Sequence, residues 1–565
     1  PTYIIREILR QTITPLCKDK SAKEILKLKI ADIACGSGAF LLETYQLLND
    51  ILIDYYIQHD TSKLVQIGEN SYRLKYAEKK QLLKNCIYGV DKDFNAAEAS
   101  KFGLLLKLLE NEDSASLINE HPILPDLEKN IFFGNSLLSS CDIKATDASD
   151  INPFDFGAMR FDAIIGNPPY LTTEGMKNFT PKELPLYKQK YTSAYKQFDK
   201  YIVFVERAMD LLKDNGLLGY IVPLKFMKVG AGQELRRLIL TQKTLEAITA
   251  FGACKVFPGK SNYTCLLIVK KTEHETFRYN EVSNLNQWKL ADKNILPIDT
   301  KSYDEISEST WALFPEHLRG AYDTILSNST TLLAITGEDN IFNGIQTSAN
   351  KVYVFQPKSE RNGIYTFEKD GQDWKVEKEV TRAYFQTSTG DDGLNTYRTF
   401  KPNACVIFPY RKNDKDKLEM IPLDDIMHDY PKLYKYLLAH ENILNAASRD
   451  IKPVPTTASE WHRYGRHQSL DACNLPKKII VGVLSAGDKY AVDSFSTFVS
   501  SGGTAGYCMI ALPEDSPYSI YYLQAILNCK YLEWISSLYG EIFGGGFIAR
   551  GTKVLKQLPI RKIDF

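Results

Sequence analysis

Short hydrophobic runs alternate with amphipathic segments along the first half of the chain. The strand-like runs include LKIADIAC, CIYGVD, NIFFGNSLL, FDAIIGNPPY, GLLGYIVPL and TCLLIVKK, and the helical pattern FLLETYQLLNDIL follows the first of them. Strands of a parallel sheet are nearly continuous in apolar residues, and the helices between them cover both faces of the sheet. Residues 1–271 are therefore predicted to form a doubly wound, Rossmann-like α/β domain.

The pattern changes after residue 271. Residues 272–330 are polar and weakly periodic, as in KTEHETFRYN and DTKSYDEISEST, which is typical of a connector. From residue 331 to residue 565, aromatic strand-like runs, Gly-rich turns such as VSSGGTAGY and IFGGGF, and a helical stretch at 519–539 predict a C-terminal mixed α+β domain. Two domains and a connector suit a chain of 565 residues.

Composition narrows the class of protein only slightly. Basic and acidic residues balance at 69 each, so a nucleic-acid surface would have to be a local patch. The 10 cysteines include no CxxC pair, which indicates reduced core thiols and predicts no metal site. No apolar stretch approaches the roughly 20 residues of a membrane-spanning helix, so we expect no membrane partner and a cytoplasmic, prokaryotic location.

Three successive predicted strands end in groups that suit a nucleotide-like ligand. In ADIACGSGAF, the strand with Asp32 runs into Gly36 and Gly38, where a tight turn and the free N–H groups of a new helix allow close approach to a ligand. In CIYGVDKDF, Asp91 could accept both hydroxyls of a ribose. A plain strand-to-helix turn explains the glycines equally well, and a helix N-cap explains Asp91.

The spacing between these two strands is unusual. It is much longer than the roughly 20 residues of a dinucleotide-binding fold, so we expect a helical insertion around residues 51–84. The third strand, NIFFGNSLL, places Asn135 and Ser136 at the edge where doubly wound sheets bind ligands, although both residue types are also common in turns.

The fourth strand of this series, FDAIIGNPPY, ends in an unusually stiff segment. Proline fixes its own φ and restricts the preceding residue, so Asn167 and Pro168 have little freedom, and Pro169 stiffens the segment further. The Asn167 side-chain oxygen and the Pro168 carbonyl are two rigid acceptors beside the ring of Tyr170. They suit a planar amino group such as the exocyclic nitrogen of adenine, which could then attack a sulfonium-borne methyl group. A flipped base could stack on the tyrosine, and a chance turn is the alternative.

The ordered series ADIACGSGAF, YGVDKD, FFGNSLL, IIGNPPY, NGLLGYIVPLKFM and VFPGKSNYTCLLIVKK resembles the gamma class of adenine-N6 DNA methyltransferases, the TaqI-like group. The resemblance implies S-adenosylmethionine as cofactor. The cofactor-binding residues that it implies are Asp32, Ala34, Gly36, Gly38, Phe40, Asp91, Asn135 and Ser136. The residues that it implies around the target adenine are Asn167, Pro168, Pro169, Tyr170 and Phe257.

Two further features of the resemblance bear on the cofactor pocket. It places Phe198 or Asp199 near the cofactor, although an amphipathic helix explains most of that stretch. Members of the class also carry a Thr-Pro element ahead of the first helix, and this chain opens at PTYIIREIL, inside that element. We therefore expect an upstream part that this sequence lacks.

The C-terminal domain carries a candidate DNA-contact segment, EWHRYGRHQSL at residues 460–470. Arginine side chains can bind phosphates or hydrogen-bond to guanine, and aromatic rings can stack on bases or insert between them. The candidate DNA contacts are Trp461, Arg463, Tyr464 and Arg466, together with Lys260 in VFPGK. A solvated, partly packed loop is the alternative. The surrounding runs are similar to the TaqI-like specificity domain of type IIG restriction–modification proteins, which implies double-stranded DNA as partner.

Type IIG proteins often carry a nuclease upstream of the methyltransferase, so the resemblance leaves open such a domain ahead of residue 1. One (D/E)xK candidate, Asp373-Trp374-Lys375, lacks a convincing acidic strand before it. Our hypothesis is therefore that this chain methylates but does not cut. Two alternatives to a sequence-specific DNA adenine methyltransferase remain: an NPPY methyltransferase acting on RNA or on a protein glutamine, and a non-catalytic DNA specificity subunit.

Overall fold

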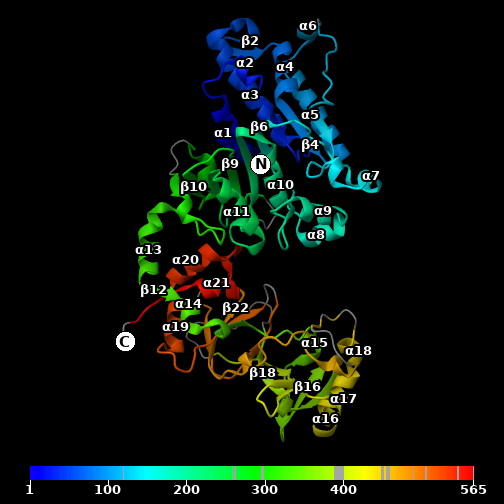
Figure 1. Cartoon of the computed structure of the whole chain (residues 1–565), viewed down its shortest axis with the longest axis vertical. Coiled ribbons are helices and arrows are strands. Elements are labelled where there is room, and N and C mark those ends of the chain that lie inside the picture. The colour runs from blue at the N-terminus through cyan, green and yellow to red at the C-terminus, as the bar shows by residue number, and fades with distance from the viewer. Residues whose placement is uncertain are drawn as a thin grey trace. The chain divides into compact units, whose positions relative to one another are not determined.

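The computed structural model describes residues 1–563 except 119, 258, 260–262, 294–297, 387–399, 447–448, 450, 453–457, 488, 503–505 and 544–545. The chain divides into two compact units, Pro1–His317 and Leu318–Phe565. Figure 1 shows the two units, and each is described by itself.

Unit 1 is built on a sheet of nine described strands in the order β11-β10-β8-β9-β7-β6-β1-β4-β5. The strands are β1 (Ile30–Asp32), β4 (Ile87–Asp91), β5 (Ile131–Phe133), β6 (Phe161–Gly166), β7 (Leu212–Pro223), β8 (Leu245–Ala250), β9 (Thr264–Lys270), β10 (Thr276–Glu281) and β11 (Asp299–Ser302). Only β9 and β11 run antiparallel to their neighbours. The predicted doubly wound, mostly parallel α/β sheet is confirmed.

Helices cover both faces of this sheet, as Figure 1 shows. They are α1 (Thr2–Cys17), α2 (Ala22–Ile25), α3 (Ala39–His59), α4 (Tyr76–Cys86), α5 (Phe94–Leu109), α6 (Ser114–Leu117), α7 (Ala148–Ile151), α8 (Thr173–Phe179), α9 (Glu183–Lys190), α10 (Lys200–Leu211), α11 (Gln233–Gln242) and α12 (Leu285–Leu290). Ala163 and Ile165 pack into the core with α1, α3 and α5, whereas Ile164 packs into the core with α10 and α11. This alternation along β6 produces two cores, one on each face.

The insertion between β1 and β4 differs in part from the prediction. Helix α3 extends to His59, a β-hairpin of β2 (Leu64–Gly68) and β3 (Ser71–Leu74) follows, and α4 leads into β4. In the sequence, the apolar–polar alternation of the hairpin extends over too few residues to distinguish these strands from the helices on either side.

The residues predicted as a connector, 272–330, are shared between the two units. Strand β10 pairs with β8 and β11 pairs with β10, so residues 272–317 extend the sheet of unit 1 and the boundary falls at His317. The sequence hides these strands because they are short and lie near one end of the sheet, where polar residues such as Arg278 alternate with the buried Phe277 and Tyr279.

Unit 2 consists of small, mainly antiparallel sheets and helices, in agreement with the predicted mixed α+β class. Its described sheets include β13-β26-β22-β24, β14-β19-β18-β25 and β15-β16-β17. Their strands are β13 (Ile341–Asn343), β14 (Val354–Phe355), β15 (Ser359–Arg361), β16 (Ile364–Lys369), β17 (Gln372–Glu377), β18 (Thr381–Phe385), β19 (Ala404–Ile407), β22 (Lys478–Gly482), β24 (Ala491–Asp493), β25 (Phe498–Val499) and β26 (Tyr507–Ile510).

The remaining elements of unit 2 surround these sheets. Its helices are α13 (Arg319–Ser327), α14 (Leu332–Thr336), α15 (Asn350–Tyr353), α16 (Leu423–Asp429), α17 (Pro431–Ala439), α18 (Glu441–Leu444), α19 (Ile520–Leu527), α20 (Lys530–Tyr539) and α21 (Thr552–Gln557). Its further strands are β12 (Ser329–Thr331), β20 (Tyr410–Lys412), β21 (Leu418–Met420), β23 (Leu484–Ser485), β27 (Ile542–Phe543), β28 (Phe547–Ala549) and β29 (Pro559–Arg561).

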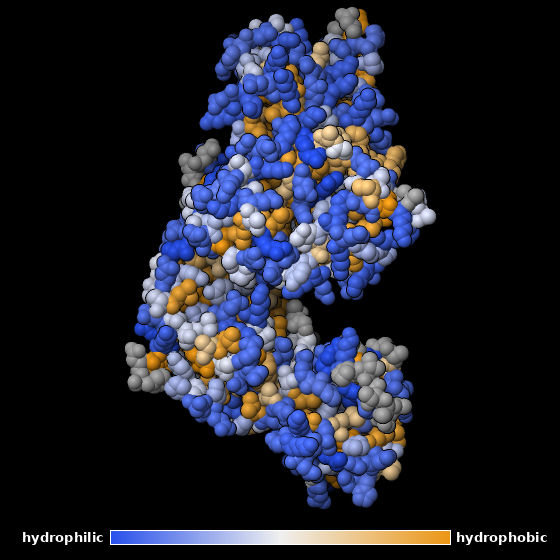
Figure 2. Space-filling model, in the orientation of Figure 1, coloured by the Kyte–Doolittle hydropathy of each residue, from blue (hydrophilic) through white to orange (hydrophobic). Residues whose placement is uncertain are grey.

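The visible surface is mostly hydrophilic, and hydrophobic residues gather only in small groups, as Figure 2 shows. Within the described part of the chain, no helix has the length and apolar character that crossing a membrane requires.

Candidate functional site

The predicted ligand-binding groups of unit 1 meet at one edge of the sheet. Strand β1 pairs in parallel with β4 on one side and with β6 on the other, so the winding of the sheet reverses at β1 and β6. Doubly wound sheets bind ligands beyond the carboxyl ends of the strands at such a switch point. Asp32, Asp91 and Gly166 are the last residues of β1, β4 and β6. The three strand ends therefore define the candidate site.

Two glycines shape the turn from β1 into α3. Gly36 has φ +54° and Gly38 has φ +84°, a left-handed conformation that favours glycine. A β-carbon on Gly38 would lie 2.4 Å from the Ser100 hydroxyl oxygen of α5, whereas one on Gly36 would meet no atom within 4 Å. Gly38 thus serves close helix packing, and the space beside Gly36 is open.

This difference predicts that Gly36→Ala and Gly38→Ala lower the free energy of unfolding by different amounts. Gly36→Ala should lower the free energy of unfolding by about 1 kcal/mol through backbone strain alone. Gly38→Ala should lower it by about 3 kcal/mol because the clash with Ser100 adds to the strain. Urea denaturation of the two variants checks this, and equal losses would contradict the packing role of Gly38.

The carboxyl groups of Asp32 and Asp91 form an acidic pair at this edge. Asp32 is buried, and its Oδ1 accepts the Ala34 N–H at 3.0 Å. Burial raises the pKa of Asp32 to about 7, the Ala34 hydrogen bond opposes the rise and the charge of Asp91 adds to it. Asp91 Oδ2 accepts the Gly36 N–H at 2.7 Å and so holds the glycine turn.

The raised pKa of Asp32 predicts a pH dependence of stability. Between pH 4 and pH 7 the folded protein keeps a proton that the unfolded chain releases, so this group lowers the free energy of unfolding as pH rises, by up to about 4 kcal/mol. Asp32→Asn removes the effect. We therefore expect the substitution to stabilise the protein more at pH 8 than at pH 5 in urea denaturation, and a difference that does not change with pH would contradict the prediction.

The loop after β5 is tied to the loop after β1. The Ser136 hydroxyl donates to the Ile33 carbonyl at 2.6 Å, and both Asn135 and Ser136 are buried. Asn135 Oδ1 accepts the Leu137 N–H at 3.1 Å, and its Nδ2 donates to the Tyr187 hydroxyl at 3.2 Å. These contacts fit the turn interpretation, and they also hold both side chains at the candidate site.

The NPPY segment follows Gly166, which has φ +153°. A β-carbon on Gly166 would lie 2.7 Å from Asp32 Oδ1, so the segment begins against the acidic pair. Pro168 is buried, while Asn167 and Pro169 are exposed. Asn167 is exposed, and within the described part of the chain no hydrogen bond engages its carboxamide, so this group is available to a ligand.

Tyr170 is held by two contacts. Its hydroxyl donates to the Ile221 carbonyl at 2.9 Å, and its ring meets Tyr201 edge-on at 6.0 Å. Burial raises the pKa of Tyr170 far above its ordinary range, so the phenol stays protonated. The ring is half-buried, and the predicted stacking on a base remains a prediction.

The other predicted site residues occupy different environments. Phe40 is buried, Phe257 and Ala34 are half-buried beside the cores, and Lys260 lies outside the described residues. Phe198 is fully buried in the core just ahead of α10, and Asp199, the N-cap of α10, forms an ion pair with Lys225.

Two features of the site escaped the sequence analysis. The Tyr220 side chain is buried beside Asp32, and its hydroxyl has no hydrogen-bond partner within the described part of the chain. Tyr220 is the neighbour of Gly166 in β7. The second feature is a buried cluster around Glu183, which contacts Lys92 and is separated from it by 91 residues. No local pattern could have revealed contacts over such a separation.

Three of the predicted DNA-contact residues of unit 2 are buried. Trp461 and Arg463 are each 5% exposed and Tyr464 is 0% exposed. The Tyr464 N–H donates to the Tyr410 hydroxyl at 2.7 Å, and Arg463 pairs with Glu460 at 3.0 Å. This placement favours the packed-loop alternative for these three residues.

Arg466 is the half-exposed member of the same segment, and its Nη1 donates to the Gly465 carbonyl at 2.9 Å. The Asp373-Trp374-Lys375 candidate lies on β17, where Asp373 pairs with Lys358 at 2.9 Å. Within the residues the structure describes, no cluster of His, Cys, Asp and Glu could hold a metal ion.

Comparison with known families covers the part of this site that contains Asp91 and the NPPY segment. The model of the Eco57I restriction-modification methylase family matches residues 85–257, which run from before Asp91 through the NPPY segment to Phe257. The chain is also 49% identical over its whole length to the type II restriction enzyme and methyltransferase RM.Eco57I of Escherichia coli. Residues 85–257 therefore belong to the Eco57I family of restriction-modification methylases.

The matched lengths differ between the relatives of this chain. It spans 57% of RM.Eco57I, and it is 24% identical over 481 residues to the type II methyltransferase M.BstVI of Geobacillus stearothermophilus, of which it spans 73%. Among solved structures, it is similar to the Type IIL restriction-modification enzyme MmeI in complex with DNA. That similarity has a TM-score of 0.53 at 13% identity, covers 91% of this chain and 60% of the other, and supports the fold.

Proposed function

We propose that this chain is a DNA adenine methyltransferase of a type II restriction–modification system, which uses S-adenosylmethionine to methylate the N6 amine of an adenine rotated out of duplex DNA. The observation that carries the proposal is the unengaged Asn167 carboxamide at the switch point, directly after a glycine that contacts Asp32. The identity of 49% to a protein named as restriction enzyme and methyltransferase supports the same activity.

The residues at the edge of the sheet fit the proposed cofactor. Open space lies beside Gly36, Gly38 allows the turn to pack closely on α5, and Asp32 supplies a carboxyl group for a cationic ligand. The unpartnered Tyr220 hydroxyl offers a buried donor beside it. We propose that these groups, with Asp91, Asn135 and Ser136, bind S-adenosylmethionine.

The proposed role of Asn167 and Pro168 is to hold the adenine amine. When bound, S-adenosylmethionine supplies a methyl group on a positively charged sulfur, which an amine lone pair can displace directly. The Asn167 side-chain oxygen and the Pro168 carbonyl would accept hydrogen bonds from the two amino N–H groups and direct the lone pair toward that methyl group. The N–C bond would form as the S–C bond breaks, and the nitrogen would then lose one proton to solvent. Pro169 keeps the segment stiff, and Tyr170 and Phe257 would contact the base.

Unit 2 is proposed to recognise the DNA sequence. Its mixed sheets lie outside the region that the methylase family model matches, and M.BstVI is similar over 81% of this chain. Arg466 is the member of the predicted contact set that is still accessible to DNA.

Labelled methyl transfer tests the proposal. The protein is incubated with labelled S-adenosylmethionine and, separately, with plasmid from a host without adenine methylation, with RNA and with a glutamine peptide. We expect label in the duplex DNA alone. Label in the RNA or the peptide but not in the DNA would assign the NPPY segment to another substrate, and no transfer to any of them would overturn the proposed activity.

A further inference from the structure

A buried carboxylate, Glu183, joins three segments that surround the candidate cofactor site. Glu183 opens α9, and its side chain is 3% exposed. One carboxylate oxygen contacts Lys92, the residue after Asp91 at the end of β4. The other contacts Lys200, the first residue of α10, at 3.2 Å. Glu183 therefore links the ends of β4, α9 and α10 at one point.

Tyr187 extends this cluster to the loop after β5. Its hydroxyl donates to Glu183 Oε2 at 2.6 Å and accepts a hydrogen bond from Asn135 Nδ2 at 3.2 Å. Tyr187 is fully buried, and the Lys200 ammonium lies 5.3 Å from the centre of its ring. Asn135 is thus connected to an ionised carboxylate through a single hydroxyl group.

The donors and acceptors fix the direction of this chain. The Leu137 N–H can only donate, so its partner is the Asn135 carboxamide oxygen, and the amino group must face Tyr187. The hydroxyl has one proton, which it gives to Glu183, so it accepts from Asn135. A charge-assisted bond to a carboxylate strengthens the hydroxyl as an acceptor.

The charge state of Glu183 supports this direction. Burial raises its pKa, but Lys200, Lys92 and the Tyr187 hydrogen bond lower it by more, and the pKa ends below its ordinary value. Glu183 is therefore ionised at neutral pH and acts only as an acceptor.

The backbone of Asn135 is held independently of Tyr187. Its N–H donates to the Asn152 carbonyl at 2.6 Å, and its carbonyl accepts the Phe154 N–H at 3.1 Å. Loss of the Tyr187 hydroxyl should leave the loop in place and remove one of the two hydrogen bonds that orient the Asn135 carboxamide.

We infer that Tyr187, anchored by Glu183, is a positioning residue that orients the Asn135 carboxamide for cofactor binding. This inference rests on the proposed function. Preorganisation of the amide lowers the ordering cost of binding, and one of its N–H groups is left for an acceptor on the cofactor.

Calorimetric binding of S-adenosylmethionine to the full chain tests the inference with Tyr187→Phe. We expect the Kd to rise about fivefold to tenfold, as loss of one net hydrogen bond predicts. The KM for the cofactor should rise by a similar factor while kcat at saturating cofactor stays within about twofold of wild type. In an Asn135→Ala background, Tyr187→Phe should cause no further loss of cofactor affinity, because the carboxamide that Tyr187 positions is absent.

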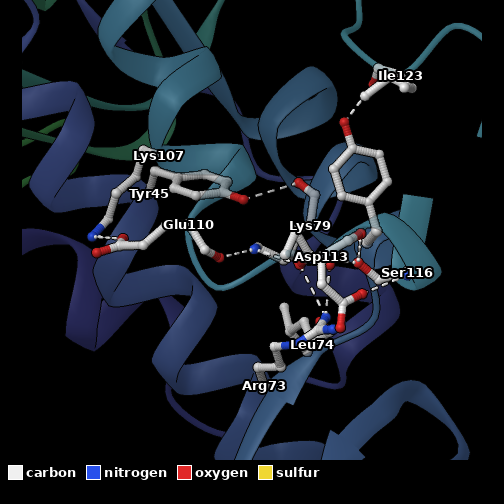
Figure 3. Close-up of polar contacts among 11 residues, drawn as sticks. Tyr45, Arg73, Leu74, Lys79, Lys107, Glu110, Asp113, Ser116 and Ile123 are labelled. Atoms are coloured by element: carbon white, nitrogen blue, oxygen red, sulfur yellow. Dashed lines mark hydrogen bonds and ion pairs between the residues drawn. The ribbon is translucent and has the colours of Figure 1, made fainter.

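Tyr45→Phe is a matched control in the same unit. Tyr45 is also a buried tyrosine, and its hydroxyl donates to the Lys79 carbonyl at 3.4 Å. Figure 3 shows Tyr45 beside Lys79. In the same region Lys79 and Arg73 each form an ion pair with Glu112. Asp91 lies just before the first residue of α5, and Glu112 follows its last residue. The 16 residues of this helix span about 24 Å, so the control pair is far from Asp91. The control should leave the Kd within about twofold of wild type.

Glu183→Gln, paired with Glu112→Gln as its control, is the second test. A neutral amide can donate to the Tyr187 hydroxyl and reverse the chain, so we expect weaker cofactor binding for Glu183→Gln even where thermal unfolding shows that both variants fold. Wild-type protein that binds no S-adenosylmethionine would overturn the proposed function. Wild-type binding that Tyr187→Phe leaves unchanged, or a loss of equal size in Tyr45→Phe, would overturn the positioning role and leave the proposed function standing.

Discussion

Asn167→Ala is expected to lower methyl transfer to DNA about 10³-fold while binding of S-adenosylmethionine is retained. The side chain is exposed at the carboxyl end of β6, and no contact with the described residues engages it, so its removal should cost little stability. What is lost is one of the two fixed acceptors for the adenine amine. Initial rates of labelled methyl transfer, with calorimetric binding of the cofactor in parallel, measure the two effects separately.

Asn178→Ala provides the control for this substitution. Asn178 is an exposed asparagine of α8, eleven positions further along the chain. Its removal should change the transfer rate by less than about twofold. Transfer by Asn167→Ala at a rate close to that of wild type, or an equal loss in both variants, would count against the proposed adenine site.

Lys478→Met is expected to destabilise unit 2 by about 3–5 kcal/mol, because it leaves an unpaired charge in the core. Lys478 and Asp493 face each other across β22 and β24, and both side chains are 0% exposed. The ammonium contacts Asp493 at 2.8 Å and the Cys473 carbonyl at 3.0 Å. Asp493 also accepts the Thr497 N–H at 2.8 Å, so the carboxylate is fixed and cannot move to solvent.

Hydrogen exchange in the full chain gives the local readout for Lys478→Met. Peptides from β22 and β26 should exchange faster than in wild type, whereas peptides from β1 and β4 should not change. If unit 2 recognises DNA, the variant should lose DNA binding and keep cofactor binding. The neighbouring Lys477 is exposed over the Tyr521 ring, and Lys477→Met should cost about 1 kcal/mol or less. Unchanged exchange in β22 would contradict the buried-pair argument.

The strands that end at the candidate site could be predicted because each is a buried run with a distinct end. Asp32, Asp91 and Gly166 close such runs, and parallel pairing places them at one edge without further information. Strands β10 and β11 could not be predicted in the same way. Strand β11 is the edge of the sheet, where polar residues are tolerated, and in β10 the polar Arg278 alternates with the buried Phe277 and Tyr279.

Burial of the segment around Tyr464 could not be read from its composition. Interleaved arginine and aromatic residues suit a nucleic-acid surface and a packed loop equally well. The deciding contacts come from residues far along the chain: the Tyr464 N–H reaches the Tyr410 hydroxyl, and the Tyr464 hydroxyl donates to the Ile407 carbonyl. The cluster of Glu183 and Tyr187 was hidden for the same reason, since its partners come from the ends of other elements.

In the proposed mechanism, the Asn167 side-chain oxygen and the Pro168 carbonyl hold the amine of an adenine. The position of the transferred methyl group on the DNA tests this most directly. DNA methylated by the wild-type protein with labelled cofactor is digested to nucleosides and separated. We expect label in N6-methyldeoxyadenosine, and about 10³-fold slower labelling with Asn167→Ala. Label in a methylated cytosine, or equal labelling of adenine by the variant, would contradict it.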